Sequence, residues 1–377
     1  MNHFYLGIDV GNSNSELSVL DEDRNCIYAD TVPTLAEPFW REALELFAGH
    51  QLHAAFEIGT HYPWLCSLLE EYCCEVVVVN AQEFEVISKA QYKTDKIDAS
   101  KIALGLWRGD LPEVIVPETR VQQDRRLVTH LHELSRQASR LKTRLRDILY
   151  AARLRCPYTD LWGTAGQTWL SEALPKLDPI EMKMAVQIVE QLKLLETQRA
   201  QMDKLVLERV QGYTEAALAH SVPGFGPLVI LGVLSSIAGI GRFADGDHLA
   251  SYFGLCGRIH QSGNTLIQGR ITKHGNKHVR WLLGQAVTHL IRRDPKVRKK
   301  YLKIRRKKCA KVARVAIMRW ITTILWELLT SQEQYRINGI RGNHLVRKPA
   351  KAKEARQTPA QKQPKVDSRA VANATAA

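Results

Sequence analysis

Residues 4–20 of the chain read FYLGIDVGNSNSELSVL and decide the fold of its first part. The run at 4–10 is short and apolar, and a second such run follows at 16–20. Between the two runs stands the polar segment GNSNS. This pattern predicts two strands joined by a tight turn, with a further turn in DEDRN at 21–25.

The chain continues with more strand-like and helix-like segments in alternation. LHAAFEI at 52–58 and EVVVV at 75–79 predict two further strands. Helices are expected between the strands, at 36–47 and 63–72. Alternating strands and helices are typical of an α/β sheet, so residues 1–118 are predicted to form an α/β domain.

The hydrophobic period then changes to that of long helices. Apolar residues spaced alternately by four and three positions form a heptad seam at Leu127, Leu131, Leu134, Ala138, Leu141, Leu145 and Ile148. A second helix is expected at 179–210, with its own seam interrupted by Arg199. We predict a helical hairpin or coiled coil over residues 119–215. The pattern leaves open whether it is a spacer or an arm for dimerisation.

Residues 216–334 are expected to form a mainly α-helical domain. PGFGP at 223–227 predicts a hairpin that opens an apolar helix, and a polar loop is expected over 257–276. A following amphipathic helix has one apolar face, formed by Val279, Leu282, Leu283, Ala286, Val287 and Leu290. From 335 to 377 the chain has few large apolar residues, which predicts a disordered basic tail.

Positive charge is concentrated in the second half of the chain. The formal net charge of the 377 residues is +14. Between Arg270 and Arg319 there are 18 Lys or Arg residues and a single acid, Asp294. A long basic segment favours a polyanionic partner, because neutralised phosphates release condensed counterions. We therefore expect nucleic acid as a partner.

The same composition argues against a secreted or membrane protein. The N-terminal MNHFYLGIDV lacks the pattern of a secretory signal, and the seven cysteines form no CxxC pair. The apolar stretch at 222–241 is about long enough to span a bilayer. It contains two prolines and five glycines, however, and so favours packed turn and helix. A cytoplasmic, nucleoid-associated protein without a membrane contact is expected.

Four carboxylates stand at positions that predict a metal site. Asp9 and Glu57 each lie at the end of a predicted strand, and Asp95 and Asp98 begin a predicted helix. A spacing of three places the last two on one helix face. Buried strand-end acids are costly unless a cation or donor satisfies them, and hard divalent cations prefer oxygen ligands. Each acid alone has an ordinary structural explanation, but together they predict a divalent-metal site.

These motifs resemble the DEDD tetrad of RuvC-like nucleases, as carried by the DEDD transposases of insertion sequences, relatives of the pilin-gene invertases and bridge-RNA-guided recombinases. The N-terminal segments that carry the resemblance are GIDVGNSNSELSV at 7–19, EIGTHYPWL at 57–65 and KTDKIDASKIA at 93–103. The C-terminal ones are VPGFGP at 222–227, LASYFGL at 249–255, QSGNT at 261–265 and ITKHGNKHVRWLL at 271–283. Cys256-Gly257 departs from the family, which more often has an apolar residue and a proline there.

The resemblance implies an RNase H-like, RuvC-like N-terminal domain with two Mg²⁺ ions held by Asp9, Glu57, Asp95 and Asp98. It also implies that Ser262 is the nucleophile of a DNA transposase or recombinase. A structured guide RNA from the same element would pair with target and donor DNA. A homodimer or tetramer with composite active sites is the implied assembly.

Several basic residues are expected to contact nucleic acid. Lys273, Lys277 and Arg280 are placed on one face of the predicted amphipathic helix, opposite its apolar stripe. The run Arg305, Arg306, Lys307 and Lys308 is expected to face phosphates with little sequence discrimination. The 223–227 hairpin resembles that of helix-hairpin-helix modules, which bind phosphate through backbone N–H groups. An ordinary helix-breaking turn explains it equally well.

Three other functions are compatible with parts of the pattern. A RuvC-like nuclease such as a junction resolvase would need the acids but form no covalent intermediate through Ser262. A sugar kinase or actin-like ATPase also begins with an Asp-x-Gly loop and a strand, but it needs a second such loop, which is not evident. A nucleic-acid-binding protein would use the acids only for structure. Metal-dependent cleavage and a covalent protein–DNA adduct separate these possibilities.

Overall fold

The computed structural model describes residues 2–59, 61–80, 95–262 and 265–337 of the chain. It divides into two compact units, Met1–His130 and Leu131–Ala377, which are considered separately. The predicted tail lies mostly outside the described residues, as does the segment that leads to Asp95. Among the helices within the described ranges, none is both long and apolar enough to cross a bilayer.

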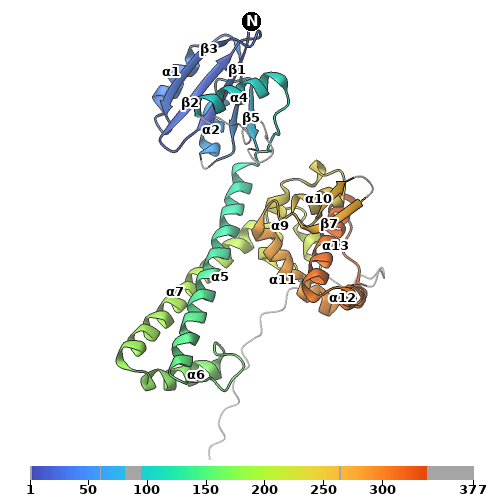
Figure 1. Cartoon of the computed structure of the whole chain (residues 1–377). Helices are drawn as coiled ribbons and strands as arrows, with labels where there is room; N and C mark the ends of the chain where they lie inside the picture. The colour runs from blue at the N-terminus through green and yellow to red at the C-terminus, as the bar shows by residue number, and fades with distance from the viewer. Residues whose placement is uncertain (1, 60, 81–94, 263–264, 338–377) are drawn as a thin grey trace, which may run out of the picture. The chain divides into compact units, whose positions relative to one another are not determined.

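The first unit is built on a five-stranded mixed sheet in the order β3-β2-β1-β4-β5 (Figure 1). Its strands are β1 (His3–Val10), β2 (Asn14–Leu20), β3 (Cys26–Pro33), β4 (Gln51–Glu57) and β5 (Glu75–Val79). Strands β1, β2 and β3 pair antiparallel, whereas β4 and β5 continue the sheet parallel to β1. The predicted α/β character of the first part of the chain is thus confirmed.

Strand β3 is the one strand of this sheet that the sequence pattern did not predict. Its residues are mostly exposed, and Val32 is the only buried member. An edge strand with one buried residue shows little hydrophobic alternation, which is the signal on which strand prediction depends.

Helices cover both faces of this sheet. Helices α1 (Glu37–Glu45) and α2 (Tyr62–Leu69) contribute Trp40, Leu44, Leu65 and Leu69 to a core with Leu6 and Ile8 of β1. On the other face, α4 (Asp95–Arg108) packs Ile102 and Leu106 against Ala55 and Val79. Because successive strand residues point to opposite faces, the odd-numbered positions of β1 face α4.

Gly7 determines how closely α4 approaches β1. A Cβ atom built on Gly7 would overlap the carbonyl oxygen of Ala99 and the backbone nitrogen of Ala103. Ala99 and Ala103 are themselves fully buried. Small residues on both elements therefore bring the helix backbone directly onto the strand. The contact is supported by Ser18 of β2, whose Oγ lies 3.0 Å from that of Ser100.

Two long helices dominate the middle of the chain. Helix α5 (Thr119–Ala151) is followed by α6 (Thr164–Ala173), the 3-10 turn η1 (Leu174–Lys176) and α7 (Pro179–Val210). In the second unit, α5 and α7 lie side by side and share a core with α6 (Figure 1). The predicted interruption at Arg199 is accommodated, because its Nη1 donates a hydrogen bond to Ser135 Oγ at 2.8 Å.

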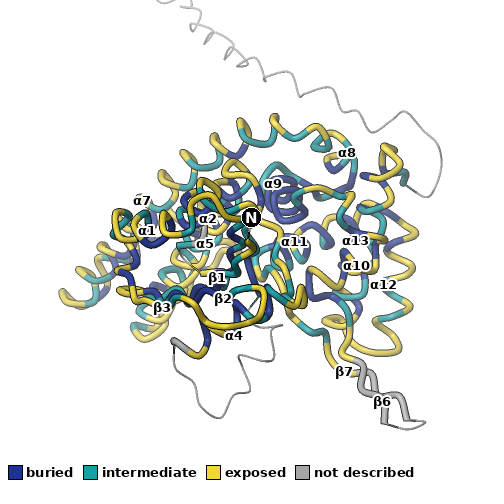
Figure 2. The backbone as a smooth tube through the Cα atoms, turned by 90° about the horizontal axis from the view of Figure 1, so that it is seen from above, coloured by how far each residue is buried: buried dark blue, intermediate teal, exposed yellow. Residues whose placement is uncertain are grey.

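The C-terminal part is mainly helical. It contains α8 (Ala216–His220), α9 (Pro227–Ile237), the 3-10 turn η2 (Ile240–Arg242), α10 (Gly246–Tyr252), α11 (Lys277–Arg293), α12 (Pro295–Lys307) and α13 (Ala310–Ser331). Helix α9 is at the centre, with every residue from Val229 to Ile237 buried (Figure 2). The predicted apolar face of α11 is confirmed residue by residue, since all six members are buried.

The predicted polar loop over 257–276 is wrong. Most of that segment is an antiparallel hairpin of β6 (Gly257–Ser262) and β7 (Thr265–Ile271). The intervening sequence, Gly263-Asn264, consists of residue types that favour two-residue hairpin loops, a signal the sequence does contain. The polar residues in both strands break the alternation of apolar and polar positions by which strands are predicted.

The one acid in the basic segment has a structural role. Asp294 is buried, and its Oδ1 accepts hydrogen bonds from the backbone N–H groups of Lys296 and Val297 at the start of α12. Its Oδ2 accepts a hydrogen bond from the hydroxyl of Tyr335 at 2.7 Å. Burial and this carboxylate raise the pKa of Tyr335 well above its ordinary range, so the phenol stays protonated and donating. Tyr335 itself is therefore packed against the domain.

A histidine pair joins α5 to α11 within the second unit. The rings of His132 and His278 lie 4.6 Å apart in an edge-to-face arrangement, and Trp281 packs on His132 in the same way. The Nδ1 atoms of both histidines are buried without a hydrogen-bond partner. Burial is the largest cause that lowers the pKa of each histidine, and His132 lowers that of His278 further. Arg136 and Lys277 also lower both pKa values, whereas Glu133 raises them.

The Gly7 contact predicts the effect of adding one methyl group. Gly7→Ala should lower the stability of the first unit by about 1–3 kcal/mol, because the new Cβ collides with backbone rather than with a flexible side chain. Thermal unfolding of the full chain measures the loss, and faster hydrogen exchange over α4 locates it. Gly59→Ala is the matched control, since its Cβ would meet only one atom, 4.0 Å away. Equal melting temperatures for the two variants would contradict the contact.

The histidine pair predicts an acid-sensitive second unit. Both pKa values are lowered in the folded state, so the unfolded chain binds more protons as the pH falls below the ordinary histidine value of 6.5. The contribution of the pair to stability should therefore be present above pH 6.5 and decline below it. His132→Phe keeps an aromatic ring without the proton site and should flatten this dependence in melting curves between about pH 5 and pH 8.

His130→Phe controls for the same substitution at an exposed position of the same helix. It should retain the acid sensitivity of the wild type. A His132→Phe profile that matches the wild type would exclude the pair as the origin.

Candidate active site and nucleic-acid interface

The two strand-end acids lie on neighbouring parallel strands. Ile8 of β1 pairs with Phe56 of β4, so Asp9 and Glu57 are the next residues on each strand in the same register. Both are partly buried. Ile8 and Phe56 face the core formed with α1 and α2. By strand alternation, Asp9 and Glu57 both belong to the opposite face, which α4 covers.

Helix α4 brings the third acid to the same face. Asp98 is only 3% exposed and directly precedes Ala99, the residue that touches Gly7. Its Oδ1 is 3.1 Å from the Nζ of Lys101, one turn further along the helix. The lysine supplies the positive charge that a buried carboxylate requires. Asp95 is the first residue of α4, but its side chain lies outside the described part of the structure.

The acids are of the type that binds a hard divalent cation, and their elements are neighbours in the fold. Three of them come from β1, β4 and α4, elements that pack on one another, and carboxylate oxygens are the ligands that Mg²⁺ prefers. Among the described side chains no group of three acids, histidines or cysteines is already close enough to hold an ion. The carboxylate of Asp98 is paired with the ammonium of Lys101 instead.

Ser262 is the last residue of β6 and pairs with Thr265 at the start of β7. The side chains of Ser262 and His260 lie outside the described residues. His274, the other histidine near it in sequence, is exposed in the turn between β7 and α11. The acids and Ser262 belong to different units.

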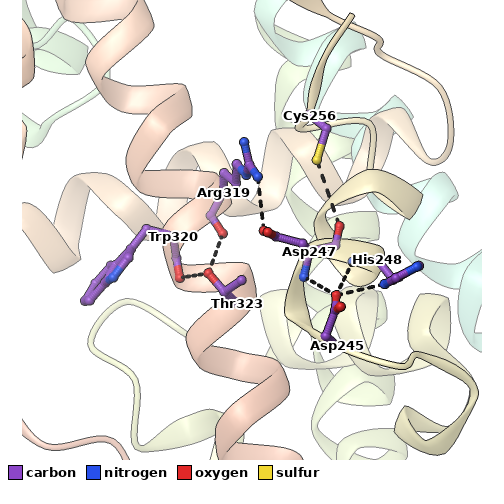
Figure 3. A network of polar contacts seen from close by, with 7 residues as sticks. All are labelled: Asp245, Asp247, His248, Cys256, Arg319, Trp320 and Thr323. Atoms are coloured by element: carbon purple, nitrogen blue, oxygen red, sulfur yellow. Dashed lines mark hydrogen bonds and ion pairs between the residues drawn. The ribbon is translucent and has the colours of Figure 1, made fainter. Parts of the chain in front are cut away.

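The segment that leads into β6 is fixed to the rest of its domain (Figure 3). Asp245 caps α10, accepting hydrogen bonds from the backbone N–H groups of Asp247 and His248 at 2.9 and 2.8 Å. Arg319 of α13 donates to the Asp247 carboxylate at 3.1 Å. Cys256, where the sequence departs from the resembled family, has its Sγ directed at the Asp247 carbonyl at 3.9 Å. The fold therefore accommodates Cys256 next to the ion pair of Arg319 and Asp247.

The basic run at the end of α12 is exposed, as a polyanion-binding surface requires. Arg305, Arg306 and Lys307 close the helix and Lys308 follows it. A hollow of about 690 Å³ runs along the same helix and is lined by Pro295, Arg298, Lys299, Leu302, Lys303, Arg306 and Lys307. Sequence reasoning had not singled out Arg298, Lys299 and Lys303. The four-residue spacing of Lys299, Lys303 and Lys307 was the available signal.

The three other predicted contacts do not form one helical face. Lys273 precedes α11 and has a left-handed backbone with φ of 59°, so its placement on the helix is wrong. Lys277 is exposed in the first turn. The guanidinium of Arg280 faces backbone carbonyl groups of its own domain. Only Lys277 is therefore placed on the helix with its side chain exposed, as a phosphate contact requires.

The 223–227 hairpin joins α8 to α9 and lines a hollow of about 510 Å³ together with His220, His289 and Arg293. Gly224 has a φ of 98°, and a Cβ there would lie 2.5 Å from the carbonyl oxygen of Ala286 on α11. Glycine is required for both reasons. The hairpin is thus packed on α11, and three basic side chains border its outer side.

Comparison with known proteins bears on both halves of the chain. A transposase model of the IS110 DEDD type matches residues 6–152, and a model described as the transposase IS116/IS110/IS902 family matches residues 216–302. The probable family 20 transposase of Pseudomonas aeruginosa is 27% identical over 154 residues, 40% of this chain and 46% of that protein. The transposase for insertion sequence element IS1111A of Coxiella burnetii is 36% identical over 121 residues, 31% of this chain and 33% of that protein.

The matched stretch is therefore less than half the length of each relative. The two family models, in contrast, match separate regions of the chain in N-to-C order and together account for more than half of its residues. The chain belongs to the IS110 family of insertion-sequence transposases.

Proposed function

We propose that this protein is a DNA transposase or site-specific recombinase that cuts and rejoins DNA with a Mg²⁺-binding carboxylate set and a serine nucleophile. The observation that carries the proposal is the placement of Asp9 and Glu57 on one sheet face, beneath the helix that carries Asp98. Family membership and the basic second half support it.

The proposal assigns a role to each region. Residues 1–118 act as a DEDD domain of RNase H-like, RuvC-like fold, for which the mixed sheet with helices on both faces is suitable. Residues 119–215 form a helical arm, and 216–334 carry the serine and the basic helices. Apart from Tyr335, which packs against the domain, residues 335–377 extend the basic surface as a tail. A dimer or tetramer would let an acidic site in one subunit act with Ser262 of another.

Asp9, Glu57, Asp95 and Asp98 would hold the metal ions, two in the proteins that the sequence resembles. Bound Mg²⁺ stabilises negative charge on the attacking and leaving oxygens of a phosphodiester displacement. The chain contributes rigidity, because β1 and β4 are paired strands and α4 is held against β1 at Gly7. Lys101 would leave the Asp98 carboxylate as an ion enters, which keeps the local charge balanced.

Ser262 would form the covalent intermediate. Its Oγ attacks phosphorus, an Oγ–P bond forms, and one P–O bond to a deoxyribose breaks. The serine proton passes to a base, and the released sugar oxygen takes up a proton. A sugar hydroxyl of the second DNA end then reverses the step and restores the serine. The phosphodiester energy is conserved, so rejoining needs no nucleotide cofactor.

A structured RNA from the same element is the proposed guide, and it would share the basic surface with DNA. The exposed cations of α12 suit either backbone, because charge contacts to phosphate carry no sequence information. Specificity would then come from base pairing. A RuvC-like resolvase would need only the acids, and the match to transposase families over both halves of the chain favours the recombinase over it.

Ser262→Ala separates the recombinase from the resolvase. The variant should fold and bind DNA but form no covalent adduct and no joined product, because it has no hydroxyl to attack phosphorus. A labelled DNA substrate incubated with Mg²⁺, denatured and resolved on a gel measures the adduct. Asp9→Asn should give neither adduct nor cleavage. Ser251→Ala, at an exposed serine of α10, is the matched control and should retain the adduct. Cleavage without any adduct in the wild type would favour the resolvase.

The basic run of α12 predicts a salt-dependent affinity. Replacing Arg305, Arg306, Lys307 and Lys308 by Ala should flatten the plot of log affinity against log salt. The slope should fall by up to about 0.9 for each duplex phosphate that the variant no longer neutralises. Sequence preference should not change. Binding isotherms at several salt concentrations measure both quantities.

A control variant removes the same amount of charge from exposed positions of the helical arm, at Arg140, Arg144, Arg146 and Lys193. It should leave the slope unchanged. Equal flattening in both variants would mean that net charge, rather than α12, determines binding.

A further inference from the structure

The β6–β7 hairpin leaves its domain through a short base where two chain segments run side by side. Hydrogen bonds continue past the strands, from Thr272 N to Cys256 O at 2.9 Å and from Lys273 N to Gly254 O at 3.2 Å. The segments that enter and leave the hairpin, 253–257 and 271–276, are here called the hairpin base.

Glycines make this base unusually tight. Gly254 and Gly275 have φ values of 68° and 77°, in the left-handed region that favours glycine. A Cβ on Gly254 would overlap the carbonyl oxygen of His274, and one on Gly275 would overlap that of Tyr252. The two segments therefore touch through their backbones, with several carbonyl groups crowded together.

Arg280 supplies the donors for these carbonyl groups. Its Nη1 lies 3.1 Å from the carbonyl oxygen of Phe253, on the entering segment. The same atom lies 2.9 Å from that of His274 and 3.1 Å from that of Gly275, on the leaving segment. Burial lowers the pKa of Arg280 somewhat, but a guanidinium stays charged in proteins. One cationic group thus joins both sides of the base.

The arginine is itself held by the start of α11. Asn276 caps this helix, accepting a hydrogen bond from His278 N at 2.8 Å, and its Nδ2 donates to Ser236 Oγ of α9 at 3.2 Å. Arg280 lies within the first turns of α11, whose apolar face is buried in the domain core. The hairpin base is therefore anchored to two buried helices.

We propose that Arg280 is a positioning residue that sets the direction of the β6–β7 hairpin and so the place of Ser262. The proposal rests on the proposed function of Ser262. Ser262 stands five residues beyond Gly257, about 17 Å along a strand. A rotation of a few degrees at the base moves that point by about 1 Å, a displacement that can lower the rate of a positioned reaction by about 100-fold.

A residue that positions the hairpin and a residue that contacts phosphate affect different measurable quantities. A residue that binds phosphate contributes to affinity and to its salt dependence, about 0.9 in slope for each contact on duplex DNA. A residue that aims the hairpin contributes to the rate of the bound complex. The two roles are separable in one variant.

The test compares Arg280→Gln and Arg280→Lys with Arg292→Gln, a control at an exposed position of the same helix. With saturating DNA and Mg²⁺, adduct formation should slow by about 10- to 100-fold in Arg280→Gln. It should be partly restored in Arg280→Lys, which keeps the charge but not the planar fork. DNA affinity should change by less than about threefold and the salt slope not at all. A slope lower by about 0.9 with an unchanged rate would overturn the proposal.

Hydrogen exchange of the DNA-free protein is a second test of the proposal, and it does not depend on adduct formation. Exchange at the amides of Thr272 and Lys273, which donate across the base, should rise at least about tenfold in Arg280→Gln if its carbonyl contacts hold the base together. Unchanged exchange would contradict the proposal. If Arg280→Gln does not fold, Arg280→Lys is judged by the same two measurements.

The failure of the proposed function is distinguishable from the failure of this inference. An adduct that persists in Ser262→Ala means that Ser262 is not the nucleophile, and Arg280 then has no nucleophile to position. Faster exchange in Arg280→Gln would in that case assign the arginine to the hairpin base alone. A serine-dependent adduct with a normal rate in Arg280→Gln would contradict the inference and leave the proposed function standing.

Discussion

The direct contact between α4 and β1 at Gly7 is the constraint on which the first unit depends. A helix normally packs on a sheet through side chains, at a spacing that their volume sets. Here the absence of a side chain at Gly7, and the small ones at Ala99 and Ala103, bring two backbones together. The residue next to Ala99 is Asp98, and two residues after Gly7 comes Asp9. The same close packing that buries the helix thus brings the segments with the carboxylates together.

In the second unit, charge placement favours the folding of α12, a helix with a high density of positive charge. Eight of the 13 residues in α12 are Lys or Arg. The acid that precedes it, Asp294, caps its N-terminus, where the helix dipole favours an anion. The cations Arg305, Arg306 and Lys307 lie in the last turn, which the dipole also favours. The ammonium of Lys300 lies 4.8 Å from the ring centre of Trp320 on α13.

The sequence could predict the elements in which an unbroken set of apolar residues is buried. Strand β1 and the apolar face of α11 are of this kind, and Asp9 and Glu57 follow from the ends of their strands. It missed β3 because an exposed edge strand needs no apolar alternation, and the β6–β7 hairpin because polar residues occupy both strands. The orientation of Arg280 could not be inferred, since one of the three carbonyl groups that it contacts belongs to Phe253, 27 residues earlier in the chain. Helical periodicity shows which side chains share a face, not what covers them.

The cations that contact specific partners within their own domain have a consequence for how this protein tolerates substitution. Arg280 contacts three carbonyl groups, Arg319 pairs with Asp247, and Lys300 lies on Trp320. At these positions the shape of the cation matters, so exchange between Lys and Arg is not conservative. At exposed positions such as Lys308 the two residues are nearly equivalent. Most exposed Lys and Arg residues could therefore be exchanged for one another, whereas the few cations with specific partners in the fold would have to keep their identity.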